Sequence, residues 1–270
     1  MLRRALITIA VAVALPSTLA AQSPATGTPR DGVMLAFENF AAIFGSRLVA
    51  AFDSIPASKY DYKPTPVQQS IGYIAQHLEN ANYALCNRLG ALKHQRSTKD
   101  TVADTVKARW PKDTLVARLR ASLRFCDTAM QQVAKLESAG NASNLLAFET
   151  DLAEHYSQLS VYMRILGLIP PSALPPRPRI AIELPASTLS RYVGLYELAP
   201  GQQFDITMQG EGLFIKPTNS GAVRLWPERS NDFFVKEVDA QITFTRDANG
   251  TVTGLVLHQY DHDRPARKIR

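Results

Sequence analysis

Three side chains that could share a metal ion lie on segments with helical periodicity. Asp151 and His155 are four residues apart, and His77 lies much earlier in the chain. Residues at i and i+4 share one face of a helix, and a carboxylate and an imidazole placed in this way can both bind one divalent metal. They can also simply hydrogen-bond each other, because buried polar side chains usually satisfy one another. The spacing leaves both interpretations open.

The Asp151–His155 pair lies within a predicted helix that ends near Gly167. Its apolar residues recur at steps of three and four, so they form one stripe that should face a core. The stripe includes His155 itself and consists of Leu145, Phe148, Leu152, His155, Leu159, Tyr162 and Leu166. We expect residues 140–144 to form a turn and a cap before this helix, and Pro170 and Pro171 to follow its end.

Three further amphipathic helices are predicted before it, over residues 31–54, 70–89 and 114–138. Residues 90–113 are polar and charged, and we expect an irregular connection there. His77 belongs to the second helix. Its small neighbours leave room for a ring or for an ion, although a hydrogen-bonded core histidine is the simpler explanation. Four such helices predict an antiparallel bundle, in whose interior His77, Asp151 and His155 could converge.

The first 21 residues have the features of a secretory signal peptide. Arg3 and Arg4 precede an apolar run over residues 5–15, and small residues follow near Ala20 and Ala21. The run is too short to span a bilayer, and its charged, apolar and small segments follow the order of a cleaved signal. We therefore expect an exported protein, periplasmic or secreted, with no membrane span after signal removal. An uncleaved anchor is the alternative.

The chain has two cysteines, Cys86 and Cys126, each within a predicted helix. In an exported protein an even pair favours a disulfide, which would join two neighbouring helices. Two buried free thiols are the alternative. Because the chain has no C-x-x-C motif, the sequence gives no reason to propose thiol redox chemistry.

Size and charge narrow the classes of partner. The 270 residues allow one or two domains, and a hydrophobic fraction of 46% suffices for sizeable cores. The formal net charge is +6, or +4 without Arg3 and Arg4. The basic residues are scattered except near the C-terminus, where a solvated strand explains them, so no nucleic-acid partner is expected.

The composition and the hydrophobic periodicity of the chain change after residue 172. Residues 173–184 are rich in proline and predict a semi-rigid linker. Beyond the linker the period changes to two, and turn-forming residues separate the apolar runs. Strands are predicted over residues 192–197, 203–208, 212–216, 223–227, 233–236, 240–245 and 252–258. Seven or eight short strands predict a small antiparallel barrel or sandwich over residues 185–270, so the fold class is α+β multidomain.

A second group of potential ligands lies at the last predicted hairpin, where His258, Asp261, His262 and Asp263 gather. These residues could bind a metal, but no third distant ligand is evident. We interpret the group as a solvated turn.

Residues 52–84 and 151–171 resemble the DinB-like fold. The first segment carries Lys-Pro-Thr-Pro and Ser-Ile-Gly before His77, and the second carries Glu-His-Tyr-x-Gln-Leu-x-x-Tyr-x-Arg. DinB-like proteins form a metal-binding four-helix superfamily that includes bacillithiol- and mycothiol-dependent enzymes. The resemblance covers residues 31–172 and implies the antiparallel four-helix bundle.

Members of this superfamily typically bind metal through one histidine on the second helix and a His-x-x-x-His pair on the fourth. The resemblance therefore implies His77 and His155 as ligands, with Asp151 in the position of the remaining histidine. The implied cofactor is a divalent metal such as zinc, nickel or manganese, without an organic cofactor. Aspartate is a competent oxygen ligand for such ions.

Residues 184–269 resemble the β domain at the C-terminus of exported beta-lactamase-like serine hydrolases. The segments 189–197, 238–244 and 254–259 carry this resemblance. The chain has no Ser-x-x-Lys and no Gly-x-Ser-x-Gly motif, so the resemblance implies a lipocalin-like accessory domain without the catalytic serine.

Two functions follow from these features. One is an exported metal-dependent enzyme of hydrolase or thiol-transferase type, for which no catalytic residue beyond the metal ligands is assigned. The other is a non-catalytic protein with a degenerate metal site that binds a small molecule or a peptide in the barrel or between the domains. A homodimer is compatible with either function.

Overall fold

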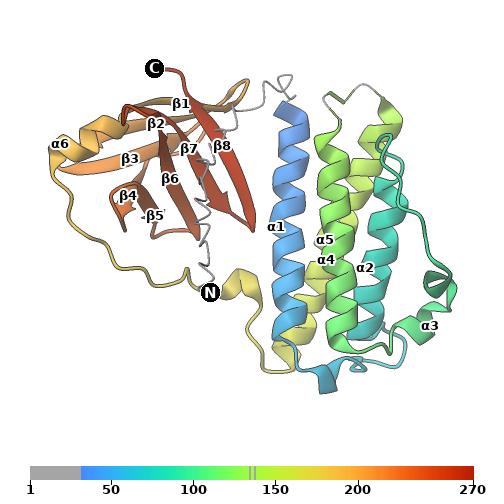
Figure 1. Cartoon of the computed structure of the whole chain (residues 1–270). Helices are drawn as coiled ribbons and strands as arrows, with labels where there is room; N and C mark the ends of the chain where they lie inside the picture. Colours follow the sequence, from blue (N-terminus) through green and yellow to red (C-terminus); the bar gives the residue numbers. More distant parts are fainter. Residues whose placement is uncertain (1–31, 134, 137) are drawn as a thin grey trace, which may run out of the picture.

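The computed structural model places a helical half beside a β-barrel, as Figure 1 shows. It describes residues 32–133, 135–136 and 138–270. The signal peptide predicted over residues 1–21 lies outside the described residues. The predicted α+β class is confirmed, because long helices precede the linker and the strands follow it.

Four long helices pack around one apolar core in the helical half. They are α1 (Gly32–Ser54), α2 (Ile71–Cys86), α4 (Lys112–Gln131) and α5 (Ala139–Ile165). α1 and α2 each contact both α4 and α5, and the four stand side by side in Figure 1. The apolar stripes predicted from the sequence face this core, since Leu78, Leu119 and Leu152 are fully buried.

Two helix boundaries differ from the sequence prediction. The expected turn over residues 140–144 is wrong, because α5 already begins at Ala139. Ser138 caps it by accepting a hydrogen bond from the backbone N–H of Asn141 at 3.1 Å, so the cap lies before the Gly- and Asn-rich residues. α4 ends at Gln131 rather than near residue 138.

α1 is long and apolar enough to cross a membrane by length and composition, contrary to the expectation for residues after the signal. In the structure it is part of the helical core, where Leu48, Ala51 and Phe52 are fully buried. Val33 and Phe40 of the same helix are about half exposed. Packing in the core therefore accounts for part of its apolar character.

A disulfide joins Cys86, at the end of α2, to Cys126 of α4. Both residues are fully buried, and their Cα atoms are 5.2 Å apart. The predicted bridge between neighbouring helices is confirmed. Such bridges persist in oxidising compartments, which agrees with an exported protein.

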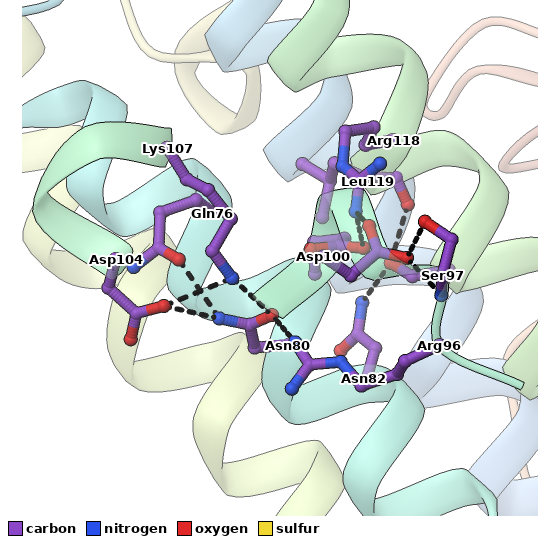
Figure 2. Close-up of polar contacts among 12 residues, drawn as sticks. Gln76, Asn80, Asn82, Arg96, Ser97, Asp100, Asp104, Lys107, Arg118 and Leu119 are labelled. Atoms are coloured by element: carbon purple, nitrogen blue, oxygen red, sulfur yellow. Dashed lines mark hydrogen bonds and ion pairs between the residues drawn. The ribbon is translucent and has the colours of Figure 1, made fainter. Parts of the chain in front are cut away.

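A buried polar network holds the connection between α2 and α4, as Figure 2 shows. The connection contains η2 (Thr98–Thr101) and α3 (Asp104–Lys107) instead of the irregular segment that was predicted. Lys107 is only 1% exposed. Its amine lies 3.0 Å from the carboxylate of Asp104 and donates to the side-chain oxygen of Asn80 at 3.1 Å. Contacts with α2 thus order a segment whose sequence has no apolar periodicity.

Arg118 of α4 organises the other part of this network. Its guanidinium pairs with Glu79 at 2.8 Å and with Asp100. Asp100 also accepts hydrogen bonds from the backbone N–H and the hydroxyl of Ser97, both at 2.7 Å. Burial favours the neutral carboxyl, but the hydrogen bonds from Ser97 and Arg118 outweigh it and lower the pKa of Asp100 to about 2.

The second half is a closed barrel of eight antiparallel strands in sequential order. The strands are β1 (Gly194–Ala199), β2 (Gln202–Gln209), β3 (Gly212–Pro217), β4 (Val223–Pro227), β5 (Asp232–Val235), β6 (Ala240–Arg246), β7 (Val252–Gln259) and β8 (His262–Lys268). β8 was not among the strands predicted individually, because its sequence is charged and contains Pro265. Only its Ala266 is buried, and pairing with β1 and β7 defines the strand.

Aromatic side chains fill the interior of the barrel. Tyr192, in the short helix η4 (Ser190–Tyr192) before β1, is fully buried, as are Tyr196 and Phe233, and Phe244 is 2% exposed. The ring centroids of Tyr192 and Phe244 are 4.4 Å apart, and those of Phe233 and Phe244 are 5.4 Å apart. The barrel is therefore a packed core of the kind expected for a small barrel.

The linker joins the two halves and is attached to the barrel. The guanidinium of Arg179 donates to Glu228 at 2.7 Å, and the N–H of Ile182 donates to the carbonyl of Pro227 at 2.8 Å. In Figure 1, β8 lies beside α1. Arg264 of β8 accordingly donates to Asn39 of α1 across the junction.

The interpretation of the last hairpin as a solvated turn holds for Asp261 and Asp263, which are exposed, but not for His262. His262 begins β8, and its ring nitrogen lies 3.4 Å from a carboxylate oxygen of Asp127 in α4. His258 of β7 instead contacts Asp263 at 2.6 Å. His262 therefore helps to join the halves through a residue of α4 that lies far away in the sequence.

Removing the disulfide should destabilise the protein. We expect the Cys86→Ala/Cys126→Ala variant to lose about 3–4 kcal/mol of unfolding free energy, because the bridge restricts the unfolded chain. Urea denaturation of the variant and of the wild-type protein, with and without reductant, measures this loss. Reductant should destabilise the wild-type protein and leave the variant unchanged. Equal stability of all four samples would contradict the expectation.

The network around Asp100 should make stability fall in acid. We expect Asp100→Asn to cost about 2 kcal/mol of unfolding free energy at pH 7. The folded-state pKa is lowered to about 2, so this contribution is present above about pH 4 and is lost as the pH falls towards 2. Denaturation curves at several pH values should converge for variant and wild type in acid. The exposed Asp61→Asn is the matched control, and a gap independent of pH would refute the assignment.

Candidate metal centre

The packing of α2 against α5 brings the three predicted ligands together. Ser70 caps α2 by accepting from the N–H of Tyr73 at 3.2 Å, which fixes where the helix begins. His77 therefore lies at the edge of the buried face, with 36% of its side chain exposed. On α5, the side chain of His155 is 10% exposed. Asp151 precedes it by one turn.

One oxygen of Asp151 lies between the two imidazoles. Its Oδ1 is 3.4 Å from Nε2 of His77 and 3.4 Å from Nε2 of His155. All three potential ligand atoms lie within 4.8 Å of one another. Among the described residues this is the group of His, Cys, Asp and Glu side chains whose spacing is suited to a metal ion.

The second oxygen of Asp151 is buried and has no hydrogen-bond partner among the described residues. Burial would raise the pKa of this carboxyl, but the hydrogen bonds from His155 and His77 outweigh it and lower the pKa to about 2. Burial likewise would lower the pKa of His155, but the contact with Asp151 raises it. The site thus holds a charged carboxylate with unused acceptor capacity.

A chain of hydrogen bonds orients His155 from behind. Tyr162 donates its hydroxyl to the carbonyl of Gln69 at 3.2 Å, and the amide nitrogen of Gln158 donates to the Tyr162 oxygen at 2.9 Å. The amide oxygen of Gln158 then lies 3.0 Å from Nδ1 of His155. Because a carbonyl can only accept, each bond in this chain has one direction, and Nδ1 of His155 must carry the proton.

In the neutral imidazole this orientation leaves Nε2 with its lone pair towards Asp151 and His77, so His155 donates a hydrogen bond to Asp151 only as the imidazolium, whose pKa the contact with Asp151 raises. Metal-binding histidines generally donate their other ring N–H to an oxygen acceptor in this way. His155 is consequently held in place, whereas the more exposed ring of His77 is the less restrained of the two.

Two of the three distances between ligand atoms match those around a bound metal ion. Ligand atoms about 2.0–2.1 Å from a tetrahedral ion lie roughly 3.3 Å apart, close to the 3.4 Å that separates Asp151 Oδ1 from each imidazole nitrogen. The remaining separation, between the two imidazole nitrogens, is at most 4.8 Å, so these nitrogens would have to approach each other for all three donors to bind one ion. The donor set and the unpartnered oxygen of Asp151 therefore fit a divalent metal with open coordination positions.

The site is accessible from the surface. Beside Asp151, a shallow hollow of about 480 Å³ on α5 is lined by residues that include Ala147, Thr150 and Glu154. The hollow includes Asp151 but neither histidine, so the partial exposure of the His77 side chain is what opens the three donors to solvent.

The sequence predicted the three ligand candidates, and the structure brings all three together. It missed Gln158, which contacts His155 from three residues along the same helix. The sequence does contain a signal for Gln158. Side chains three residues apart are neighbours on a helix surface, so an amide at that spacing from His155 could have been proposed as its partner. Tyr162 was predicted only as a core residue, although its hydroxyl continues the chain of hydrogen bonds.

Comparison with known proteins gives a family match for the barrel segment. Residues 178–268 match a family described as a domain of unknown function, DUF3471. The eight-stranded barrel of this segment fits a lipocalin-like β domain. No curated protein matches the chain.

One solved structure, titled "Crystal structure of SurE with D-Leu", is 19% identical with a TM-score of 0.29. The alignment covers 44% of this chain and 28% of that chain. A similarity of this size supports no conclusion about fold or function.

The chain of hydrogen bonds predicts the tautomer of His155. We expect neutral His155 to carry its proton on Nδ1 in the wild-type protein, and to lose this preference in Tyr162→Phe, because the Gln158 amide is then free to rotate. Long-range ¹H–¹⁵N NMR spectra of the metal-free protein distinguish the two tautomers. The spectrum of His94, which lies outside the site, should not change. An Nε2–H tautomer in the wild-type protein would contradict the proposed direction.

Proposed function

We propose that the helical half is a DinB-like four-helix bundle that binds one divalent metal through His77, Asp151 and His155. The chain would then be an exported metal-dependent enzyme of hydrolase or thiol-transferase type. The observation that supports this most is the convergence of three donor groups from α2 and α5 within 4.8 Å. The two imidazoles flank the carboxylate of Asp151, whose second oxygen has no partner among the described residues.

The three residues have different roles in this proposal. His155, oriented by Gln158, supplies a fixed nitrogen. Asp151 supplies the negative charge, and His77 supplies the adjustable nitrogen at the exposed side. A divalent ion bound here would supply Lewis-acid chemistry that polarises a substrate oxygen. Two imidazoles and one carboxylate suit zinc, and the hard carboxylate also suits manganese.

A partly buried site is favourable for this chemistry. The side chains of Asp151 and His155 are 20% and 10% exposed, so the surrounding helices exclude much of the solvent and strengthen charge interactions. His77 faces the accessible side, where a substrate would enter. Residues 31–172 would form this catalytic domain, and residues 185–270 the accessory barrel.

The alternative of a binding protein is not supported by the inside of the barrel. Tyr196, Phe233 and Phe244 fill that space with their own rings. A ligand would have to displace core side chains, which is costly in a well-packed interior. The metal site is therefore the better-supported basis for a function.

Metal binding tests the proposal directly. We expect protein purified without a histidine tag and dialysed against zinc or manganese to retain about one equivalent of ion, measured by plasma mass spectrometry, consistent with one three-ligand site. Asp151→Asn and His155→Ala should weaken binding at least about 100-fold, because each removes a direct ligand.

Asp61→Asn is the control, because it removes an exposed carboxylate that belongs neither to the three donors nor to the hollow beside them. Its affinity should equal that of the wild-type protein. Wild-type protein without a stoichiometric ion, or unchanged affinity in both ligand variants, would end the proposal.

A further inference from the structure

A cleft separates the helical half from the barrel and lies away from the metal centre. It has a volume of about 590 Å³, within the range of small-molecule sites, which often lie between domains. α1 and α4 form one wall, with Phe148 of α5 behind them, and the turn between β7 and β8 forms the other. The Asp127–His262 contact joins the two walls.

Small and apolar residues form the floor of the cleft. Ala41, Ala42, Gly45 and Val49 of α1 are all buried and line it in successive turns. A side chain at Gly45 would meet Leu123 of α4 at 3.3 Å, so glycine permits the close approach of these helices. The short side chains leave a hollow surface suited to an apolar group.

Most charged groups at the cleft are already paired. Arg120 pairs with Asp53, Asp127 with His262, and Asp263 with His258. Two groups have no ion pair among the described residues. They are Arg124 on the helical wall and Asp261 on the barrel wall, both exposed, so the lining of the cleft offers one unpaired charge of each sign.

The turn that carries Asp261 has an unusual backbone. Tyr260 and Asp261 have φ values of 56° and 60°, a left-handed conformation that glycine or asparagine usually occupies in such hairpins. Bulky residues in this conformation persist only where the surroundings hold them in place. Both side chains line the cleft, so the turn directs a ring and a carboxylate to it.

We propose that this cleft binds short peptides with free termini. The peptide ammonium would pair with Asp261, its carboxylate with Arg124, and an apolar side chain would lie on the floor formed by α1. Charge complementarity on both walls selects a zwitterion over a simple anion or cation. The proposal involves no residue of the metal centre and does not depend on it.

Removing matching charges from protein and ligand tests this inference. Isothermal titration calorimetry would use the dipeptide leucylphenylalanine, its N-acetyl form without the ammonium, and its amide form without the carboxylate. We expect Asp261→Asn to weaken the free dipeptide about fivefold or more, but the N-acetyl form less than twofold. Arg124→Gln should show the same pattern for the amide form.

Four further variants complete the experiment. Ser46→Phe should abolish binding, because its ring fills the cleft that Ser46 lines. Arg109→Gln and Glu211→Gln, exposed charges outside the cleft, should bind the dipeptide as the wild-type protein does, and so should His155→Ala. The proposal is overturned if the dipeptide does not bind, if Ser46→Phe binds it unchanged, or if the charge variants weaken blocked and free ligands equally.

Discussion

The position of α2 between α4 and α5 is the constraint on which the helical half depends. A covalent bond between Cys86 and Cys126 fixes the end of α2 to α4. One turn earlier along α2, Asn82 donates to Ser122 of α4 at 2.9 Å. With α2 held on that side, its other side meets α5 at His77. A rotation of α2 about its axis would move the His77 ring away from Asp151, so the centre depends on packing distant from it.

Much of this arrangement could be predicted because it follows from local periodicity. Apolar steps of three and four defined the buried faces, and the i, i+4 spacing of Asp151 and His155 put them on one face. His77 was expected near them because facing helices of a bundle can converge, and family resemblance assigned it to the same centre. The cysteines were predicted to pair because an exported protein carries an even pair, and their places on two helices indicated which elements the bridge joins. Period-two alternation likewise indicated seven of the eight strands.

The features that were missed depend on contacts between distant segments. No local pattern shows that Lys107 is buried, because its partner Asn80 lies on another helix. β8 is defined by its neighbours β1 and β7, and its own residues are mostly exposed. Similarly, His262 acquires its role only when the barrel meets Asp127 of α4. Sequence reasoning fails most where charged residues are ordered by partners far along the chain.

The closure of the barrel between β1 and β8 has a mechanical consequence. These strands are antiparallel neighbours, so Gly194, where β1 begins, lies at the same end as residue 270, and the N–H of Leu195 bonds the carbonyl of Arg270 at 2.8 Å. A force applied between these two points would break the hydrogen bonds between β1 and β8 one after another, starting at that end. Tension between the two ends of the barrel would therefore load these hydrogen bonds in turn and not all at once.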